Sequence, residues 1–218
     1  MSLAVANRSE QRQSAAATAE RHLPANRYDR VWATVMTATD SVLRRVYGVQ
    51  SFTDSPDCLL RIARATAPRE LRLGDGTLVH PGQPIALLHF WNEHIPRFAP
   101  RGPDLAWARI FRHRMQSSLR ALARHMEEDH AWDDTQAIHG CVNFGSRRRR
   151  WQIQLAAERF GFELVPVDVP CGLHEIGEDI LIWCFARAFN PVALRRHVLW
   201  RDRTELWISR ASLTRRYG

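Results

Sequence analysis

Apolar residues recur every three or four positions in several stretches of the chain, a spacing that is typical of amphipathic helices. The valines between Val31 and Val46 follow this spacing and predict a helix over residues 28–48 that ends at Gly48. Ser55-Pro56 provides a start signal for a short helix. Further helices are predicted over residues 57–65, 104–129, 145–160 and 173–189.

Short apolar runs that are bounded by Gly and Pro predict strands between these helices. The run 85–91 is apolar on both faces except at His89, which predicts a buried central strand. Gly74-Asp75-Gly76 predicts a hairpin turn. The remaining strands are expected at residues 70–73, 78–79, 135–142, 162–167, 197–200 and 205–209, the last two as a hairpin. This order predicts one α/β domain with a mixed β-sheet flanked by helices.

The N-terminal residues 1–26 are rich in Ala, Ser, Gln and Arg and have few large apolar side chains, so we expect a disordered tail before a domain at 27–218. They have no continuous apolar segment typical of a secretory signal, and no run approaches the ~20 residues that span a membrane. The four cysteines show no CxxC pairing, which favours reduced thiols. We therefore expect a cytoplasmic protein, with peripheral association with the inner membrane as the further option.

All 31 basic side chains are Arg, and the formal net charge is +8. The absence of Lys excludes a Schiff-base lysine, a Walker A lysine and a lysine general base. Positive charge favours anionic partners such as phospholipid headgroups, acidic glycans or nucleic acid. A coding bias toward Arg is the alternative explanation. No recognisable motif for binding nucleic acid accompanies the charge.

The order of several motifs resembles the YkoP-like domain family. The Gly-Asp-Gly-Thr turn at 74–77 and the Pro-Gly turn at 81–82 precede Ile-Ala-Leu-Leu-His-Phe-Trp-Asn at 85–92. The strand at 137–140, the helix end at 158–162 and Leu-Trp-Ile-Ser at 206–209 follow, so the resemblance spans about 28–218. In this family His89 and Asn92 match a polar pair after the central strand. The family also occurs fused to polysaccharide deacetylases, which implies a role in cell-envelope glycan or lipid metabolism.

The first candidate site is the polar exit of the central strand, which carries His89, Asn92, Glu93 and His94. The spacing of these residues is one longer than the HxxEH zinc motif, and an extended chain directs His94 away from His89 and Glu93. We therefore expect no metal and no cofactor. Glu93 could orient a histidine for general acid–base catalysis. The alternative is that His89 is a hydrogen-bonded core residue.

The second candidate site follows the strand at 135–142. If this strand neighbours the central strand, His139, Asn143 and His89 would line one crevice, because ligands collect at the carboxyl ends of strands in open α/β sheets. Cys141 could act as a nucleophile with a histidine base. A buried cysteine is usually inert, however, and we expect Cys141 to be a packing residue.

The third candidate site is a run of four arginines, Arg147, Arg148, Arg149 and Arg150, at the expected start of a helix. The helix dipole disfavours cations there, and a bound phosphate or carboxylate would reverse this effect. A solvated run of charge is the alternative explanation.

These features favour recognition of an anionic cell-envelope precursor, such as a phospholipid, glycolipid or glycan headgroup. In that interpretation Asn92, His94, Asn143 and the four arginines bind the ligand. A small transferase or hydrolase with His89, Glu93 and His139 as catalytic residues is the second hypothesis. Non-specific binding of nucleic acid is the third. The sequence leaves open whether the protein is an enzyme, which ligand it binds and what its oligomeric state is.

Overall fold

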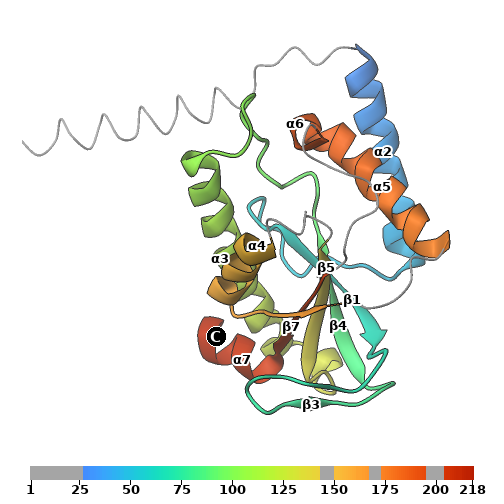
Figure 1. The fold of residues 1–218 in the computed structure, drawn as a ribbon. Coiled ribbons are helices and arrows are strands. Elements are labelled where there is room, and N and C mark those ends of the chain that lie inside the picture. The colour runs from blue at the N-terminus through green and yellow to red at the C-terminus, as the bar shows by residue number, and fades with distance from the viewer. Residues whose placement is uncertain (1–26, 143–149, 167–172, 195–203) are drawn as a thin grey trace, which may run out of the picture.

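The computed structural model describes residues 27–142, 150–166, 173–194 and 204–218 (Figure 1). The helices are α2 (Arg27–Val46), α3 (Leu105–Glu128), α4 (Arg150–Phe160), α5 (Leu173–Phe189), α6 (Pro191–Leu194) and α7 (Arg210–Tyr217), with a short 3-10 helix at His130–Trp132. The strands are β1 (Leu60–Thr66), β2 (Leu71–Arg72), β3 (Leu78–Val79), β4 (Pro84–Phe90), β5 (Ala137–Val142), β6 (Glu163–Pro166) and β7 (Thr204–Ser209). The expected tail at 1–26 and the expected strand at 197–200 lie outside the described residues.

Five strands form one mixed sheet in the order β1-β4-β5-β7-β6. The pair β4–β5 is parallel, and the other neighbouring strands are antiparallel. β4 and β5 are therefore adjacent, as the shared-crevice hypothesis required. The predicted α/β class with a mixed sheet flanked by helices is confirmed.

One face of the sheet packs against α3 and α7, with α4 on the same side (Figure 1). The apolar stripe of α3 at Met115, Leu119, Leu122 and Met126 is buried there, as the helical spacing predicts. Ile208 of β7 belongs to the same core cluster. Most of the apolar core lies between this face and the helices.

The opposite face of the sheet is partly covered by the predicted hairpin, which forms β2 and β3. Leu73 and Val79 from the hairpin pack with Ile85 of β4 and Trp207 of β7. Because side chains alternate along a strand, the residues of β5 and β7 that share this face include several polar groups. The sheet therefore has one apolar face and one face that is polar beyond the hairpin.

The predicted helix at 57–65 is wrong, because Leu60–Thr66 forms strand β1 at the edge of the sheet. Ser55-Pro56 precedes a turn in which the Cys58 N–H donates to the Ser55 carbonyl at 3.1 Å. The first four residues of β1 are buried on both sides, so the strand lacks the alternation that identifies a half-exposed strand. Pairing with β4 therefore decided the conformation of this segment.

The helices α2 and α5 lie side by side, away from α3, α4 and α7 (Figure 1). Asp29 of α2 accepts a hydrogen bond from Arg187 of α5 at 3.1 Å, and the Trp32 indole N–H donates to the Cys184 carbonyl at 3.3 Å. Polar contacts from Thr37 and Asp40 connect α2 to the region around β1 and β4. We call α2 and α5 together the helix pair.

Candidate functional site

The turn after β4 is fixed by His94. Its Nδ1 lies 2.8 Å from the Cys58 carbonyl O, and its ring stacks on Trp91 with a centroid separation of 3.8 Å. Arg114 of α3 donates to the His94 carbonyl at 3.1 Å. Asn92 is half-buried in the same turn. These contacts connect the turn to α3 and to the residues before β1.

Glu93 contacts α2 and the Trp91 side chain. Its carboxylate accepts hydrogen bonds from the Thr37 hydroxyl at 2.8 Å and from the Trp91 indole at 3.1 Å. The guanidinium of Arg61 lies 4.0 Å from the same carboxylate. The structure therefore places Glu93 in the attachment of α2, and within the described part of the chain it does not form the pair with a histidine that the acid–base hypothesis requires.

Arg61 is the centre of that attachment. Its side chain is buried on β1, forms an ion pair with Asp40 of α2 at 2.7 Å, and lies over the Trp91 ring at 4.0 Å. Burial lowers the pKa of Arg61, and the hydrogen bond and charge of Asp40 oppose that shift. The ion pair compensates for the cost of burying the guanidinium.

A second polar group lies on the partly covered face of the sheet. His139 Nε2 is 3.9 Å from Glu205 Oε1, and the imidazole stacks on Trp207 with a centroid separation of 4.3 Å. Glu205 Oε2 accepts hydrogen bonds from Arg69 at 2.7 Å and from the Trp207 indole at 2.9 Å. Burial lowers the pKa of His139; the Glu205 charge opposes this shift, and Arg69 and His89 lower the pKa further.

His89 and His139 therefore lie on the same face of the neighbouring parallel strands β4 and β5, and the crevice that they were expected to line stays a prediction. The carboxylate beside them belongs to Glu205, whereas Glu93 lies elsewhere. Sequence reasoning missed Glu205. The available signal was the two-residue spacing of Glu205 and Trp207, which places both side chains on one face of β7. In the structure, His139 of β5 lies on the same face of the sheet.

Cys141 is exposed although β5 is the central strand of the sheet, so the expectation that it is a packing residue is wrong. In the antiparallel pairing of β5 with β7, Cys141 lies directly opposite Glu205. The polar face of the sheet is therefore open to solvent at this position.

Two further candidate groups are only partly described. Asn143 and Arg147–Arg149 lie outside the described residues, and the backbone of Arg150 begins α4. The anion site that was expected at this helix start stays a prediction.

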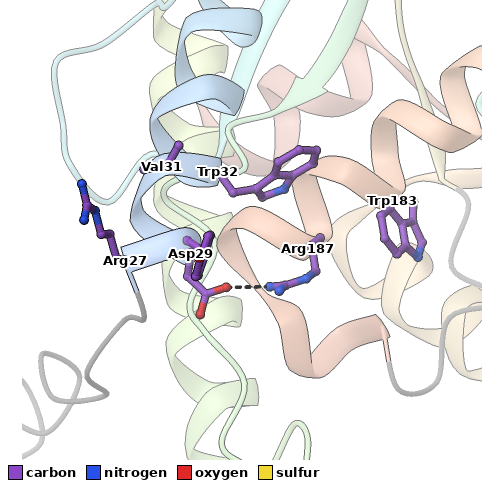
Figure 2. Close-up of a pocket in the computed structure, with 7 residues that line it drawn as sticks. Arg27, Asp29, Val31, Trp32, Trp183 and Arg187 are labelled. Carbon is purple, nitrogen blue, oxygen red and sulfur yellow. Dashed lines mark hydrogen bonds and ion pairs between the residues drawn. The ribbon is translucent and has the colours of Figure 1, made fainter.

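The helix pair carries an open groove of about 650 Å³ that sequence reasoning did not predict (Figure 2). Trp32 of α2 and Trp183 of α5 line it, together with Arg187. The other lining residues come from the first two turns of α2: Arg27, Tyr28, Asp29 and Val31. The groove thus combines aromatic rings with guanidinium groups.

The apolar stripe of α2 is exposed over most of its length. Val31, Val35, Val42 and Val46 have exposed fractions of 58%, 49%, 58% and 71%. The valine spacing thus identified the helix and its apolar face, and that face is turned to solvent. Helical geometry places Arg27 and Arg45 beside this stripe.

Among the described residues, no three His, Cys, Asp or Glu side chains are grouped so that they could hold a metal ion. No helix in the described ranges has the length and apolar character needed to cross a membrane.

Comparison with known families supports the resemblance seen in the sequence. The family model of the YkoP domain matches residues 29–217, which is most of the chain. Comparison with curated proteins and with solved structures gives no match. The chain belongs to the YkoP domain family.

Proposed function

We propose that the protein binds anionic phospholipid at a membrane surface through the helix pair. The observation that carries this proposal is the groove that Trp32, Trp183, Arg27 and Arg187 line; Figure 2 shows Arg187 in its ion pair with Asp29. Tryptophan is enriched at membrane–water interfaces, where its ring contacts apolar chains and its N–H remains near polar groups. Arginine forms bidentate contacts with phosphate.

The exposed apolar stripe of α2 also supports lipid binding by this surface. The stripe runs from Tyr28 to Val46, which corresponds to roughly 27 Å at 1.5 Å per residue. A helix that lies in the interfacial plane buries one apolar face and keeps cations at its border. The valine stripe with Arg27 and Arg45 beside it has this arrangement.

Charge complementarity favours anionic lipid over a second copy of the chain. The net charge of +8 makes two copies repel each other, whereas it attracts an anionic surface. Interfacial binding also gives the exposed valines an apolar environment without a transmembrane segment.

Co-sedimentation with vesicles tests this proposal. We expect the protein to sediment with phosphatidylglycerol vesicles and to stay in the supernatant with phosphatidylcholine vesicles. Replacing Arg27 and Arg45 with Gln should weaken binding about 30-fold, because surface cations contribute roughly 1 kcal/mol each at an anionic membrane and 1.4 kcal/mol is about tenfold. The matched control is R120Q/R124Q, which removes the same charge from the exposed side of α3 and should leave most binding intact.

Equal sedimentation with both lipids would contradict the proposal, as would equal losses in the two double variants. Sedimentation equilibrium of the protein without lipid measures its oligomeric state and can also contradict the proposal. A dimer that dissociates when Val35 and Val42 become Ser would show that the stripe is an interface between copies.

A further inference from the structure

The outer side of α3 carries a row of exposed arginines that is separate from the helix pair. We call these residues the arginine stripe: Arg109, Arg112, Arg120 and Arg124. All four side chains are exposed, and within the described part of the chain none of the four forms a hydrogen bond or an ion pair. At 3.6 residues per turn and 1.5 Å per residue, the stripe covers about 120° of the helix circumference and is roughly 22 Å long.

A coding bias that replaces Lys by Arg does not account for this arrangement. Such a bias leaves the acidic partners of the cations in place, yet no Asp or Glu occurs in residues 105–126. Arg109 and Arg112 are three positions apart, and Arg120 and Arg124 are four apart, so like charges are neighbours on the helix surface. Like-charge pairs at these spacings destabilise a helix. A bound anion would remove that repulsion.

Arg114 shows how an arginine with a structural role behaves on the same helix. Its Nε lies 2.9 Å from Asp57 Oδ1, and its guanidinium donates to the His94 carbonyl at 3.1 Å. Arg114 therefore connects α3 to the turn after β4 and to the residues before β1. The stripe arginines make no such connection, so their charge is available to a ligand.

The end of α7 adds a cation beside the arginine stripe. Burial raises the pKa of Tyr217, and the charges of Arg216 and Arg120 oppose this shift, so both guanidinium groups lie near the Tyr217 hydroxyl. Arg216 is exposed and donates one hydrogen bond to the Arg159 carbonyl at the end of α4. The cationic surface thus continues from α3 onto α7.

The side chains of the arginine stripe and its surroundings indicate the kind of partner. From Phe111 to Arg124 every exposed side chain is Arg or His, so the surface lacks the apolar residues that a membrane-binding helix inserts into lipid. Trp107 and Phe111 stack on each other on the opposite side of α3, so they offer no ring to the bases of a single strand. A nucleic-acid duplex presents one phosphate charge per ~1.7 Å of its axis, and Arg binds phosphate through bidentate contacts.

We propose that the arginine stripe binds the phosphate backbone of double-stranded nucleic acid without selecting a base sequence. Phosphate contacts fix the position of a protein on the duplex and carry no sequence information themselves. The stripe lies on α3, apart from the helix pair (Figure 1). This binding therefore goes beyond the lipid binding proposed for the helix pair and does not depend on it.

The salt dependence of duplex binding tests the proposal. Fluorescence anisotropy with a labelled DNA duplex measures the affinity of the unaltered protein between about 50 and 200 mM salt. We expect the logarithm of the affinity to fall with the logarithm of the salt concentration with a slope of about −3.6, because each of four neutralised phosphates contributes about 0.9. Undetectable binding, or a slope that stays above about −1, would overturn the proposal.

Double variants then locate the binding surface. R120Q/R124Q and R109Q/R112Q should each make the slope shallower by about 1.8, because each removes two phosphate contacts. R27Q/R45Q removes the same charge from the helix pair and should leave the slope unchanged. Equal changes in all three double variants would show diffuse attraction to the whole protein and would overturn the assignment to α3.

The two stripe variants change opposite ends of α3, and thermal unfolding shows for each whether the fold is retained. R27Q/R45Q should weaken vesicle binding and spare duplex binding, and R120Q/R124Q should do the reverse. The lipid proposal and the nucleic-acid proposal can therefore fail independently.

Competition with other polyanions tests the class of partner. Polygalacturonate at the same concentration of charge should displace the labelled duplex less than unlabelled duplex does, because its carboxylates are more widely spaced than the phosphates. Equal displacement would show that the stripe recognises acidic glycans and would overturn the proposal. A single strand of the same length should also compete more weakly, and stronger competition by the single strand would contradict recognition of a duplex.

Discussion

At the scale of single residues, the charged groups that hold the structure together differ strongly in burial. Arg61 is 2% exposed and depends on Asp40, whereas Arg64 and Asp134 form an ion pair in which both side chains are about half exposed. A buried charge without its partner costs several kcal/mol, and an exposed pair contributes little. Removing the aspartate charge should therefore lower the free energy of unfolding much more in the Arg61–Asp40 pair than in the Arg64–Asp134 pair.

Replacing Asp40 with Asn should lower the free energy of unfolding by about 3 kcal/mol, because Arg61 then loses its closest counter-charge. Replacing Asp134 with Asn is the matched control and should cost less than about 1 kcal/mol. Urea denaturation measures both values. Similar losses in the two variants would contradict the role given to Arg61.

At the scale of elements, the sequence predicted α3 and the central strand well because their patterns reflect local burial. The stripe from Met115 to Met126 has helical spacing and packs on the sheet. The same reasoning predicted a helix where the structure has β1. A strand that is buried on both faces lacks the alternation of apolar and polar residues by which a strand is recognised. It identified His89 and His139 but not Glu205, whose contact with His139 depends on the pairing of β5 with β7.

The end of α4 provides a prediction about backbone geometry. Gly161 has φ +86° there, and an added Cβ would lie 3.2 Å from the side chain of Arg216. Gly161→Ala should therefore lower the free energy of unfolding by about 1–2 kcal/mol. Gly177 within α5 has no atom near its Cβ position, and Gly177→Ala should raise the stability by up to about 1 kcal/mol. Thermal unfolding distinguishes the two, and equal effects would contradict this account.

At the scale of the whole molecule, the described residues form two parts with different surfaces (Figure 1). The sheet with α3, α4 and α7 contains the main core and the polar face at Cys141. The helix pair exposes apolar side chains beside arginines and is attached to the sheet through polar contacts around Arg61. This division agrees with the proposal that the helix pair binds an anionic membrane surface while the sheet domain stays outside the lipid.

Contact of the groove with lipid can be measured directly by tryptophan quenching. Vesicles of phosphatidylglycerol with brominated acyl chains quench indoles that enter the interface. We expect Trp32→Phe/Trp183→Phe to remove most of the quenching seen in the unaltered protein. Trp151→Phe, which changes an exposed tryptophan on α4, should leave it unchanged. Quenching that persists in the double variant, or that is lost only in Trp151→Phe, would contradict membrane binding through the helix pair.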